Sequence, residues 1–146
     1  MKYMNRNGNH VKDDPLTSKV IGLAIKVHQE LGTGFDESIY HRSLEIELAE
    51  AGVHFVSEAP LTVSYRGRIV GKFSADLIIE ERLLLELKAL EILPVRAEVQ
   101  TVNYLKACGL EIALILNFGT APLQIKRKYR NRPPIDFDLR LHETEP

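Results

Sequence analysis

Apolar residues recur at helical spacing in three stretches of the chain, at 17–31, 36–51 and 95–108. Each stretch is followed by a glycine, the residue that most often closes an α-helix. Thr17 or Ser18 is suited to cap the first helix, because a hydroxyl oxygen can accept from the exposed amides of the first turn. The residues expected to be buried are Val20, Leu23, Ala24, Val27 and Leu31 in the first helix, Tyr40, Leu44 and Leu48 in the second, and Val95, Val99, Val102 and Leu105 in the third.

Extended segments lie between the second and third helices. Residues 54–65 contain two short ones, broken at Ala59-Pro60, and a turn at 66–68 leads into a strand at 69–79. A further strand is expected at 82–89. Short polar turns join these segments, so we expect them to pair as an antiparallel meander of three or four strands.

Two more strands follow the third helix. Residues 111–118 form a nearly continuous apolar run, typical of a strand covered on both faces, and 123–129 are typical of an edge strand. Strands joined through a helix lie parallel in one sheet, with a right-handed crossover. The expected fold class is therefore α/β, a sandwich in which helices flank a mixed β-sheet.

The chain length and composition indicate one domain. Of 146 residues, 45% are hydrophobic and 27% charged, as in ordinary globular proteins. We expect this domain to span 17–132. Residues 1–16 are polar and predict a flexible lead-in, and residues 133–146 predict a C-terminal tail.

Charge and cysteine content exclude several function classes. The formal net charge of −1 provides no global basic field for nucleic acid, so polyanion binding would need a local patch or a metal. A single cysteine excludes an internal disulfide framework. No apolar run is long enough for a membrane span, and we expect a cytoplasmic protein without membrane contact.

The hairpin at 71–89 carries the candidate chemistry. Side chains alternate along a strand, so Glu86 and Lys88 share one face of its second strand. On its first strand, Asp76 is expected on the face opposite Ala75 and Leu77.

The turn decides whether the two carboxylates meet. A two-residue turn at Glu80-Glu81 would put Asp76 and Glu86 on opposite faces, whereas an odd-length turn, such as 80–82, pairs them directly. Two-residue hairpins prefer Asn-Gly or another glycine pair, because their central residues need positive φ. Glu80-Glu81 fits that poorly, so we favour the odd-length turn.

Paired carboxylates repel one another unless a cation lies between them. Oxygen ligands of this kind suit Mg²⁺ or Mn²⁺. The residues alone leave a second interpretation open, in which this is an amphipathic hairpin with a solvated acidic face.

Glu37 has two interpretations as well: it shares the inward face of Tyr40 and Leu44, or it is an exposed first-turn residue favoured by the helix dipole.

Asp76, nine intervening residues and then Glu86-x-Lys88 resemble the PD-(D/E)XK nuclease superfamily, although Ala75 stands where the superfamily usually has proline. The segment from Gly34 to Tyr40, GFDESIY, resembles the G-x-x-E-x-x-Y signature of a small bacterial family within it. The resemblance covers about residues 18–130. It implies a restriction-endonuclease-like sandwich.

The resemblance also implies roles for individual residues. Asp76 and Glu86, with the Leu87 carbonyl, would bind Mg²⁺ or Mn²⁺, and Lys88 would orient or activate the attacking water. Glu37 would be an additional metal-binding carboxylate. Gln100, with Tyr104 beside it, would support Lys88 or the substrate.

The implied activity is metal-assisted hydrolysis of phosphodiester bonds in nucleic acid, with DNA favoured over RNA. The alternative is a non-catalytic module of the same fold that binds nucleic acid or protein; a hydrolase of small phosphates is disfavoured by the absence of a glycine-rich phosphate loop. So small a chain would take its specificity from a homodimer, a protein partner or the substrate's own structure. Candidate contacts to the nucleic-acid backbone are Arg66, Arg68, Lys126, Arg127 and Lys128.

Overall fold

The computed structural model describes residues 2–4, 10–12 and 14–130. Its elements in chain order are β1 (Lys2–Met4), β2 (His10–Lys12), α1 (Pro15–Leu31), α2 (Glu37–Glu50), β3 (Phe55–Tyr65), β4 (Arg68–Ile79), β5 (Leu83–Lys88), α3 (Val95–Cys108), β6 (Ile112–Asn117) and β7 (Gln124–Tyr129). The expected tail at 133–146 lies outside the described residues. No helix in the described ranges is long and apolar enough to cross a membrane.

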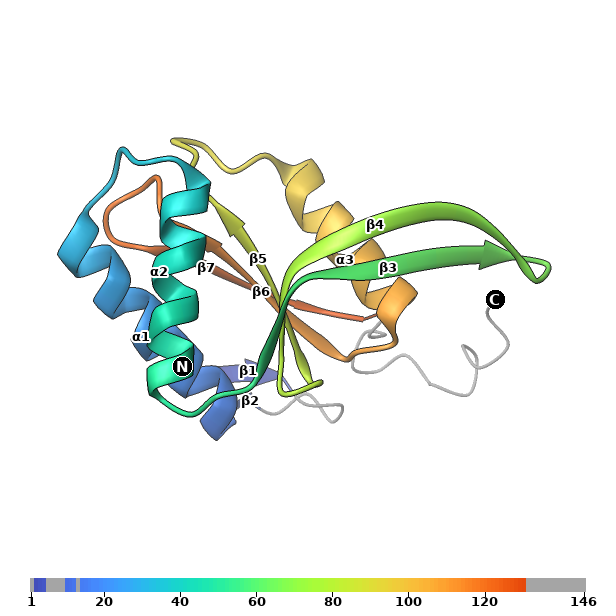
Figure 1. Ribbon diagram of the computed structural model, residues 1–146, viewed down its shortest axis with the longest axis horizontal. Helices are drawn as coiled ribbons and strands as arrows, with labels where there is room; N and C mark the ends of the chain where they lie inside the picture. The colour runs from blue at the N-terminus through green and yellow to red at the C-terminus, as the bar shows by residue number, and fades with distance from the viewer. Residues whose placement is uncertain (1, 5–9, 13, 131–146) are drawn as a thin grey trace.

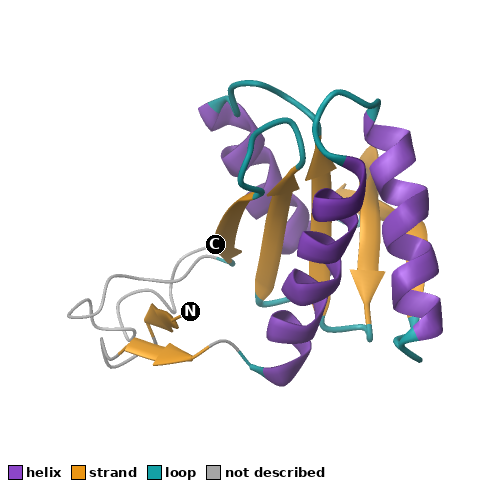
Figure 2. Ribbon diagram, turned by 90° about the vertical axis from the view of Figure 1, so that its left-hand side faces the viewer, coloured by secondary structure: helices purple, strands orange, loops and turns teal. Residues whose placement is uncertain are grey.

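The main sheet has the strand order β3-β4-β5-β6-β7. All neighbours are antiparallel except β5 and β6, which α3 connects in parallel. Figure 2 shows this sheet between the helices. The α/β fold class is thus confirmed, with the parallel pair where the sequence predicted it. The short strands β1 and β2 pair separately, within the segment that the sequence predicted as a flexible lead-in.

Two hydrophobic clusters cover the two faces of the sheet. One packs α1 and α2 against residues such as Leu85, Leu87 and Leu114. The other packs Tyr104 and Leu105 of α3 against the opposite face. Because Leu85 and Leu87 face the first cluster, Glu86 and Lys88 are directed toward the α3 side, as the strand alternation predicted.

Helix α1 begins earlier than its predicted cap. It starts at Pro15, and Oδ1 of Asp14 accepts a hydrogen bond from the amide of Thr17 at 2.8 Å. Proline suits the first helical position because its missing N–H would be unpaired there in any case.

The predicted buried face of α3 was wrong in its first two turns. Val95 and Val99 are 73% and 56% exposed, and Ala97 and Thr101 are buried instead. The sheet beneath α3 presents small residues such as Ala113. This surface lets the helix approach through its own small side chains, and the valines remain in solvent.

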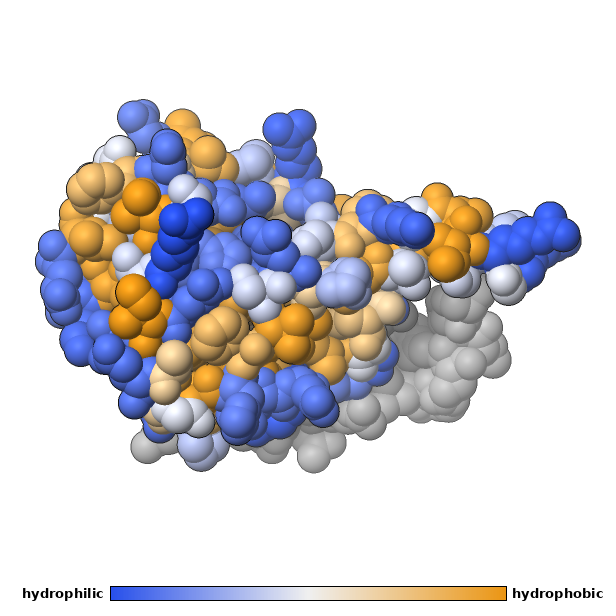
Figure 3. All heavy atoms as spheres, in the orientation of Figure 1, coloured by the Kyte–Doolittle hydropathy of each residue, from blue (hydrophilic) through white to orange (hydrophobic). Residues whose placement is uncertain are grey.

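The predicted break at Ala59-Pro60 was also wrong, since β3 runs through both residues. Proline cannot donate a ladder hydrogen bond, but β3 is an edge strand and needs a neighbour on one side only. Strands β3 and β4 therefore form a long hairpin, which projects from the molecule at the right of Figure 1. Figure 3 shows apolar surface along this projection, where Tyr65, Ile69 and Val70 are exposed.

Candidate active site

The turn between β4 and β5 sets the register of the site. Leu77 lies opposite Leu85, and Ile79 lies opposite Leu83. Three residues therefore separate the paired strand ends, which confirms the odd-length turn. The same register brings Asp76 opposite Glu86.

The turn reaches that register with positive φ at two glutamates, a conformation that the sequence analysis considered unfavourable for them. Glu80 and Glu81 both have positive φ, at 52° and 57°. The amide of Arg82 donates to the carbonyl of Ile79 at 2.9 Å. Positive φ is uncommon outside glycine, so the tight turn is kept by the pairing of the strands around it.

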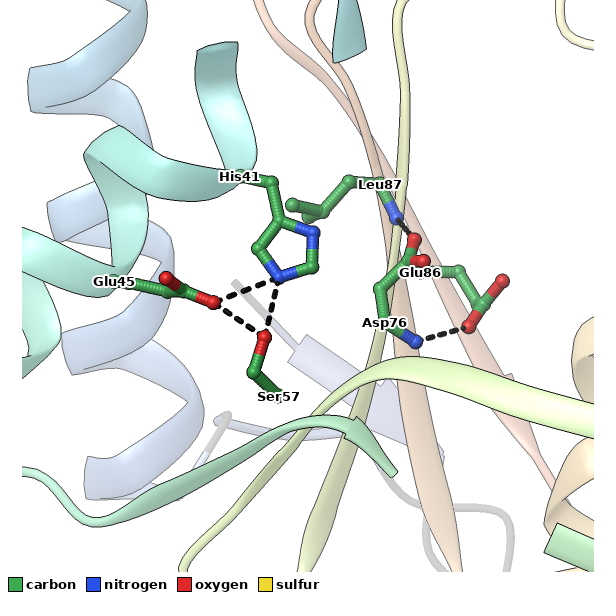
Figure 4. A network of polar contacts seen from close by, with 6 residues as sticks. All are labelled: His41, Glu45, Ser57, Asp76, Glu86 and Leu87. Atoms are coloured by element: carbon green, nitrogen blue, oxygen red, sulfur yellow. Dashed lines mark hydrogen bonds and ion pairs between the residues drawn. The ribbon is translucent and has the colours of Figure 1, made fainter. Parts of the chain in front are cut away.

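At the site, hydrogen bonds from backbone amides to carboxylate side chains connect β4 and β5, in place of the backbone–backbone pairing seen nearer the turn. The amide of Asp76 donates to Oε2 of Glu86 at 3.0 Å, and the amide of Leu87 donates to Oδ2 of Asp76 at 2.7 Å (Figure 4). Each carboxylate is therefore held through one oxygen. The other oxygen of each, Oδ1 of Asp76 and Oε1 of Glu86, makes no hydrogen bond with the described part of the chain.

Strand β4 is irregular at Asp76. Its pairing with β3 skips this residue, and Glu58 across from it has a φ of 51°. The strict alternation predicted for β4 was wrong here: Ala75 packs in the α3 cluster, whereas Leu77 packs with α1 and α2. Such a local irregularity re-aims a side chain, and here that side chain is Asp76.

Helix α2 brings Glu37 toward the pair. Glu37 is its first residue, and Gly34 just before it has a φ of 107°, which favours glycine. Tyr40 is buried, its ring stacks on Phe118 at 4.6 Å between centroids, and its hydroxyl donates to the Gly32 carbonyl at 2.5 Å. Tyr40 thus anchors the loop that positions Glu37.

The electrostatics couple these groups to one another. Burial raises the pKa of Glu86 to about 8, and the charge of Asp76 adds to that rise. Burial raises the pKa of Asp76 too, opposed by the hydrogen bond from the Leu87 amide. Burial and the Asp76 charge raise the pKa of Glu37. The Lys88 ammonium lowers the pKa of all three carboxyls, so it lies within electrostatic reach of each.

The loop after Lys88 is fixed by residues that the sequence analysis did not identify. The Phe118 amide donates to the Lys88 carbonyl at 2.8 Å. The buried amide of Asn117 binds both the N–H and the carbonyl of Leu90, at 2.8 and 2.9 Å. A Cβ at Gly119 would lie 2.4 Å from the Leu90 backbone, so only glycine permits this approach.

His41 is a second group that the sequence analysis missed. Its Nε2 lies 2.9 Å from Oγ of Ser57 and 3.0 Å from Oε2 of Glu45, and its ring lies on the side of Asp76 (Figure 4). The signal for it was present, because His41 follows Glu37 by one helical turn and therefore shares its face.

A cleft of about 1150 Å³ opens between α3 and the β3–β4 hairpin, with Lys88 in its lining. Gln100 and Tyr104 both line it, one turn apart as predicted. Burial raises the pKa of Tyr104, and the charges of Glu86 and Asp76 add to this rise. The cleft therefore adjoins the carboxylates.

The predicted nucleic-acid contacts lie elsewhere. Arg66 and Arg68, at the turn of the projecting hairpin, are absent from the cleft lining. Lys126, Arg127 and Lys128 lie on edge strand β7. Of these, Lys126 and Lys128 are ion-paired with Glu98 of α3, which makes them structural partners of that helix. The basic residues that do line the cleft, Lys88, Arg96 and Lys106, include two that the sequence analysis did not select.

Comparison with known proteins agrees with this geometry. The sequence model of a family described as the PD-(D/E)XK nuclease superfamily matches residues 14–128. The chain belongs to the PD-(D/E)XK nuclease superfamily. No curated protein matches the chain significantly.

A solved structure described as "Crystal structure of SSO0001" is similar, with a TM-score of 0.51 and 18% identity over 73% of this chain. The chain spans 55% of the length of that protein. At this identity the likeness concerns the fold alone.

Members of the PD-(D/E)XK superfamily typically use divalent metals, which carboxylate oxygens can hold. In residues 14–130 and the short strands before them, no three His, Cys, Asp or Glu side chains form a metal-holding group. Asp76 and Glu86 nevertheless fit as two oxygen ligands, because each retains an oxygen outside the hydrogen bonds described above. Burial raises the pKa of both carboxyls, and a hard cation bound between them would favour their charged forms.

Proposed function

We propose that this protein is a metal-dependent nuclease that hydrolyses phosphodiester bonds of nucleic acid, with DNA as the preferred substrate. One observation carries the proposal: hydrogen bonds join Asp76 to Glu86 and Leu87 and leave one oxygen of each carboxylate unbonded among the described residues, beside a cleft that has Lys88 in its lining. The superfamily membership supports nuclease chemistry in particular. DNA is preferred here by the general habit of that superfamily.

The proposed roles follow from where each group lies. Asp76 and Glu86 would hold Mg²⁺ or Mn²⁺, with the Leu87 carbonyl as a further ligand. A cation bound there would supply Lewis-acid stabilisation of the phosphate and lower the pKa of the attacking water. The Lys88 ammonium would orient that water and balance the charge that develops on the phosphate oxygens.

Glu37 lies within electrostatic reach of Asp76, and Gln100 lines the same cleft as Lys88. Glu37 would hold a second cation or a water. Burial raises the pKa of Glu37, and the nearby charge of Asp76 raises it further, which is consistent with this role. Gln100 is exposed in the cleft, and its amide can hydrogen-bond Lys88 or a substrate phosphate. Tyr104 would support this side of the site through its ring.

We also propose that the chain belongs to the subfamily defined by the G-x-x-E-x-x-Y signature. The fold gives each signature residue a physical task. Gly34 has the positive φ that the loop needs, Glu37 begins α2 toward the carboxylate pair, and Tyr40 anchors the loop through the Gly32 carbonyl.

The test measures cleavage of labelled DNA and RNA with Mg²⁺, Mn²⁺ or a chelator, beside metal binding by calorimetry. Asp76→Asn and Lys88→Gln should each lower cleavage by about 10²–10³-fold. Glu81→Gln is the matched control, because it removes an exposed carboxylate from the turn of the same hairpin. Cleavage that survives in Asp76→Asn would overturn the proposal. Metal binding without cleavage of any substrate would instead favour the non-catalytic module.

A further inference from the structure

The cleft beside Lys88 has an unusual charge composition for a nearly neutral protein. Lys88, Arg96 and Lys106 line it, and none of the described residues in its lining is acidic. The net charge of the whole chain is −1. The cleft is therefore a local concentration of positive charge, complementary to a polyanion.

These cations form no salt bridge within the described residues, although the charge of Lys88 reaches the carboxyls of Glu37, Asp76 and Glu86. No carboxylate there is within ion-pair distance of Lys88, Arg96 or Lys106. On the edge strand β7, by contrast, Lys126 and Lys128 are both paired with Glu98. Arg96 and Lys106 are thus available to phosphate groups.

The cleft is also partly apolar. Phe73 is 42% exposed in its wall, and Leu90 and Val99 expose comparable fractions of their surface. Phosphate groups are charged and make no favourable apolar contact with such a surface. The apolar faces of nucleic-acid bases can pack against it, and in a duplex those faces are hidden by stacking.

The Phe73 ring is held in place at this wall. Its centroid lies 5.4 Å from that of Tyr104, with the two planes inclined by 44°. A Cβ at Gly71 would lie 3.3 Å from the ring, so glycine leaves the space that Phe73 needs. Tyr104 in turn lies within reach of the charges of Glu86 and Asp76. The exposed ring is therefore connected to the carboxylates through a single side chain.

We propose that the cleft binds single-stranded nucleic acid, with an unpaired base stacked on Phe73 and the flanking phosphates on Arg96 and Lys106. This inference rests on the proposed nuclease function, because it names the substrate class of the same site. A strand bound in this way passes Lys88, so cleavage is directed to single strands or to unpaired ends and flaps.

The sequence offers a sensitive probe of this contact, because the chain contains no tryptophan. Phe73→Trp therefore places a single tryptophan in the cleft wall, whose emission can be excited separately from that of the tyrosines. With chelator present, titration with an oligo(dT) should quench its emission, and a hairpin duplex of equal length should not. Tyr65→Trp is the matched control, because residue 65 is an exposed aromatic of the same hairpin outside the cleft lining.

Affinity measurements complete the test. Wild-type protein in chelator should bind oligo(dT) at least tenfold more tightly than the duplex, as measured by fluorescence anisotropy. Phe73→Leu should weaken binding of the single strand about tenfold, and Phe73→Tyr should restore it, because stacking needs an aromatic ring rather than bulk. An oligo(rU) arm shows whether the contact extends to RNA.

Two results would overturn the inference: equal or tighter binding of the duplex, and unchanged affinity in Phe73→Leu when its thermal unfolding matches the wild type. Binding in chelator does not depend on hydrolysis, so failure of the nuclease proposal is measured separately. Single-strand binding without cleavage would retain this inference and reject that function.

Discussion

Helix α3 lies between two groups of charged residues. Those on one side are paired in salt bridges, and those on the other side are not, in the part of the chain that the structure describes. On the β7 side, Glu98 pairs with Lys126 and Lys128, and the hydrogen bond from Lys128 lowers the pKa of its carboxyl. On the cleft side, burial raises the pKa of Glu86 to about 8, and Arg96 lines the cleft without a carboxylate partner among the described residues.

This difference in pairing distinguishes charges that stabilise the fold from charges that a ligand could neutralise. A pair such as Glu98 and Lys128 neutralises itself, so nothing more needs to bind there. A buried carboxylate beside a half-buried one, Glu86 beside Asp76, costs stability, and such perturbed groups concentrate at functional sites. We therefore propose that the cleft side binds a ligand and that the β7 side holds α3 against the sheet.

The largest expected effect concerns the stability of the metal-free protein. The pKa of Glu86 rises from an unperturbed 4.5 to about 8 on folding. The folded state therefore holds its proton more tightly, and its stability should fall as pH rises from about 4.5 through 8. Glu86→Gln should remove most of this fall and exceed the wild type by about 2–4 kcal/mol at pH 9, as measured by urea unfolding in chelator.

Glu98→Gln is the matched control for that experiment, since it changes the same residue type on the paired side and should not stabilise the protein at pH 9. A wild type whose stability is flat across this range would mean that the carboxylates are not a source of strain.

A smaller effect is expected on binding of nucleic acid. Arg96→Gln combined with Lys106→Gln should weaken binding of a single-stranded oligonucleotide about tenfold and reduce the salt slope of log K by about 1.4, or 0.7 for each lost phosphate contact. Lys126→Gln combined with Lys128→Gln removes the same charge from the β7 side. It should leave both affinity and slope unchanged, as measured by anisotropy at several salt concentrations.

Equal losses in the two double variants would show that only the overall charge matters. The distinction between the two sides of α3 would then be lost.

The smallest effect is expected from breaking the paired side itself. Glu98→Gln should cost up to about 1 kcal/mol at pH 7, measured by urea unfolding, because the carboxylate is partly solvated. The pKa of Glu98 is lowered on folding, so its contribution exists above the unperturbed value of 4.5 and disappears as pH falls through the folded one. Glu81→Gln, in the exposed β4–β5 turn, is the control for loss of a surface carboxylate. A deficit in Glu98→Gln that persists at pH 2 would point to packing instead of charge.

Much of the carboxylate centre could be predicted from the sequence, because its geometry is local. Strand alternation directed Glu86 and Lys88 to one side, and the odd-length turn brought Asp76 opposite Glu86. Helical spacing put Glu37 on the face of Tyr40, whose burial is confirmed. The irregularity of β4 at Asp76 could not be predicted, since it depends on pairing with two neighbouring strands at once.

By itself, the sequence determined the order of the elements, the fold class and the carboxylate pair with its lysine, because periodicity and turn length act between residues close along the chain. Only the tertiary structure decided which cations face the cleft. The basic run of β7 was among the predicted nucleic-acid contacts, yet Glu98 engages two of its lysines, whereas Arg96 and Lys106 line the cleft. The rotation of α3 about its axis makes that choice, and it is set by how closely small side chains let the helix approach the sheet.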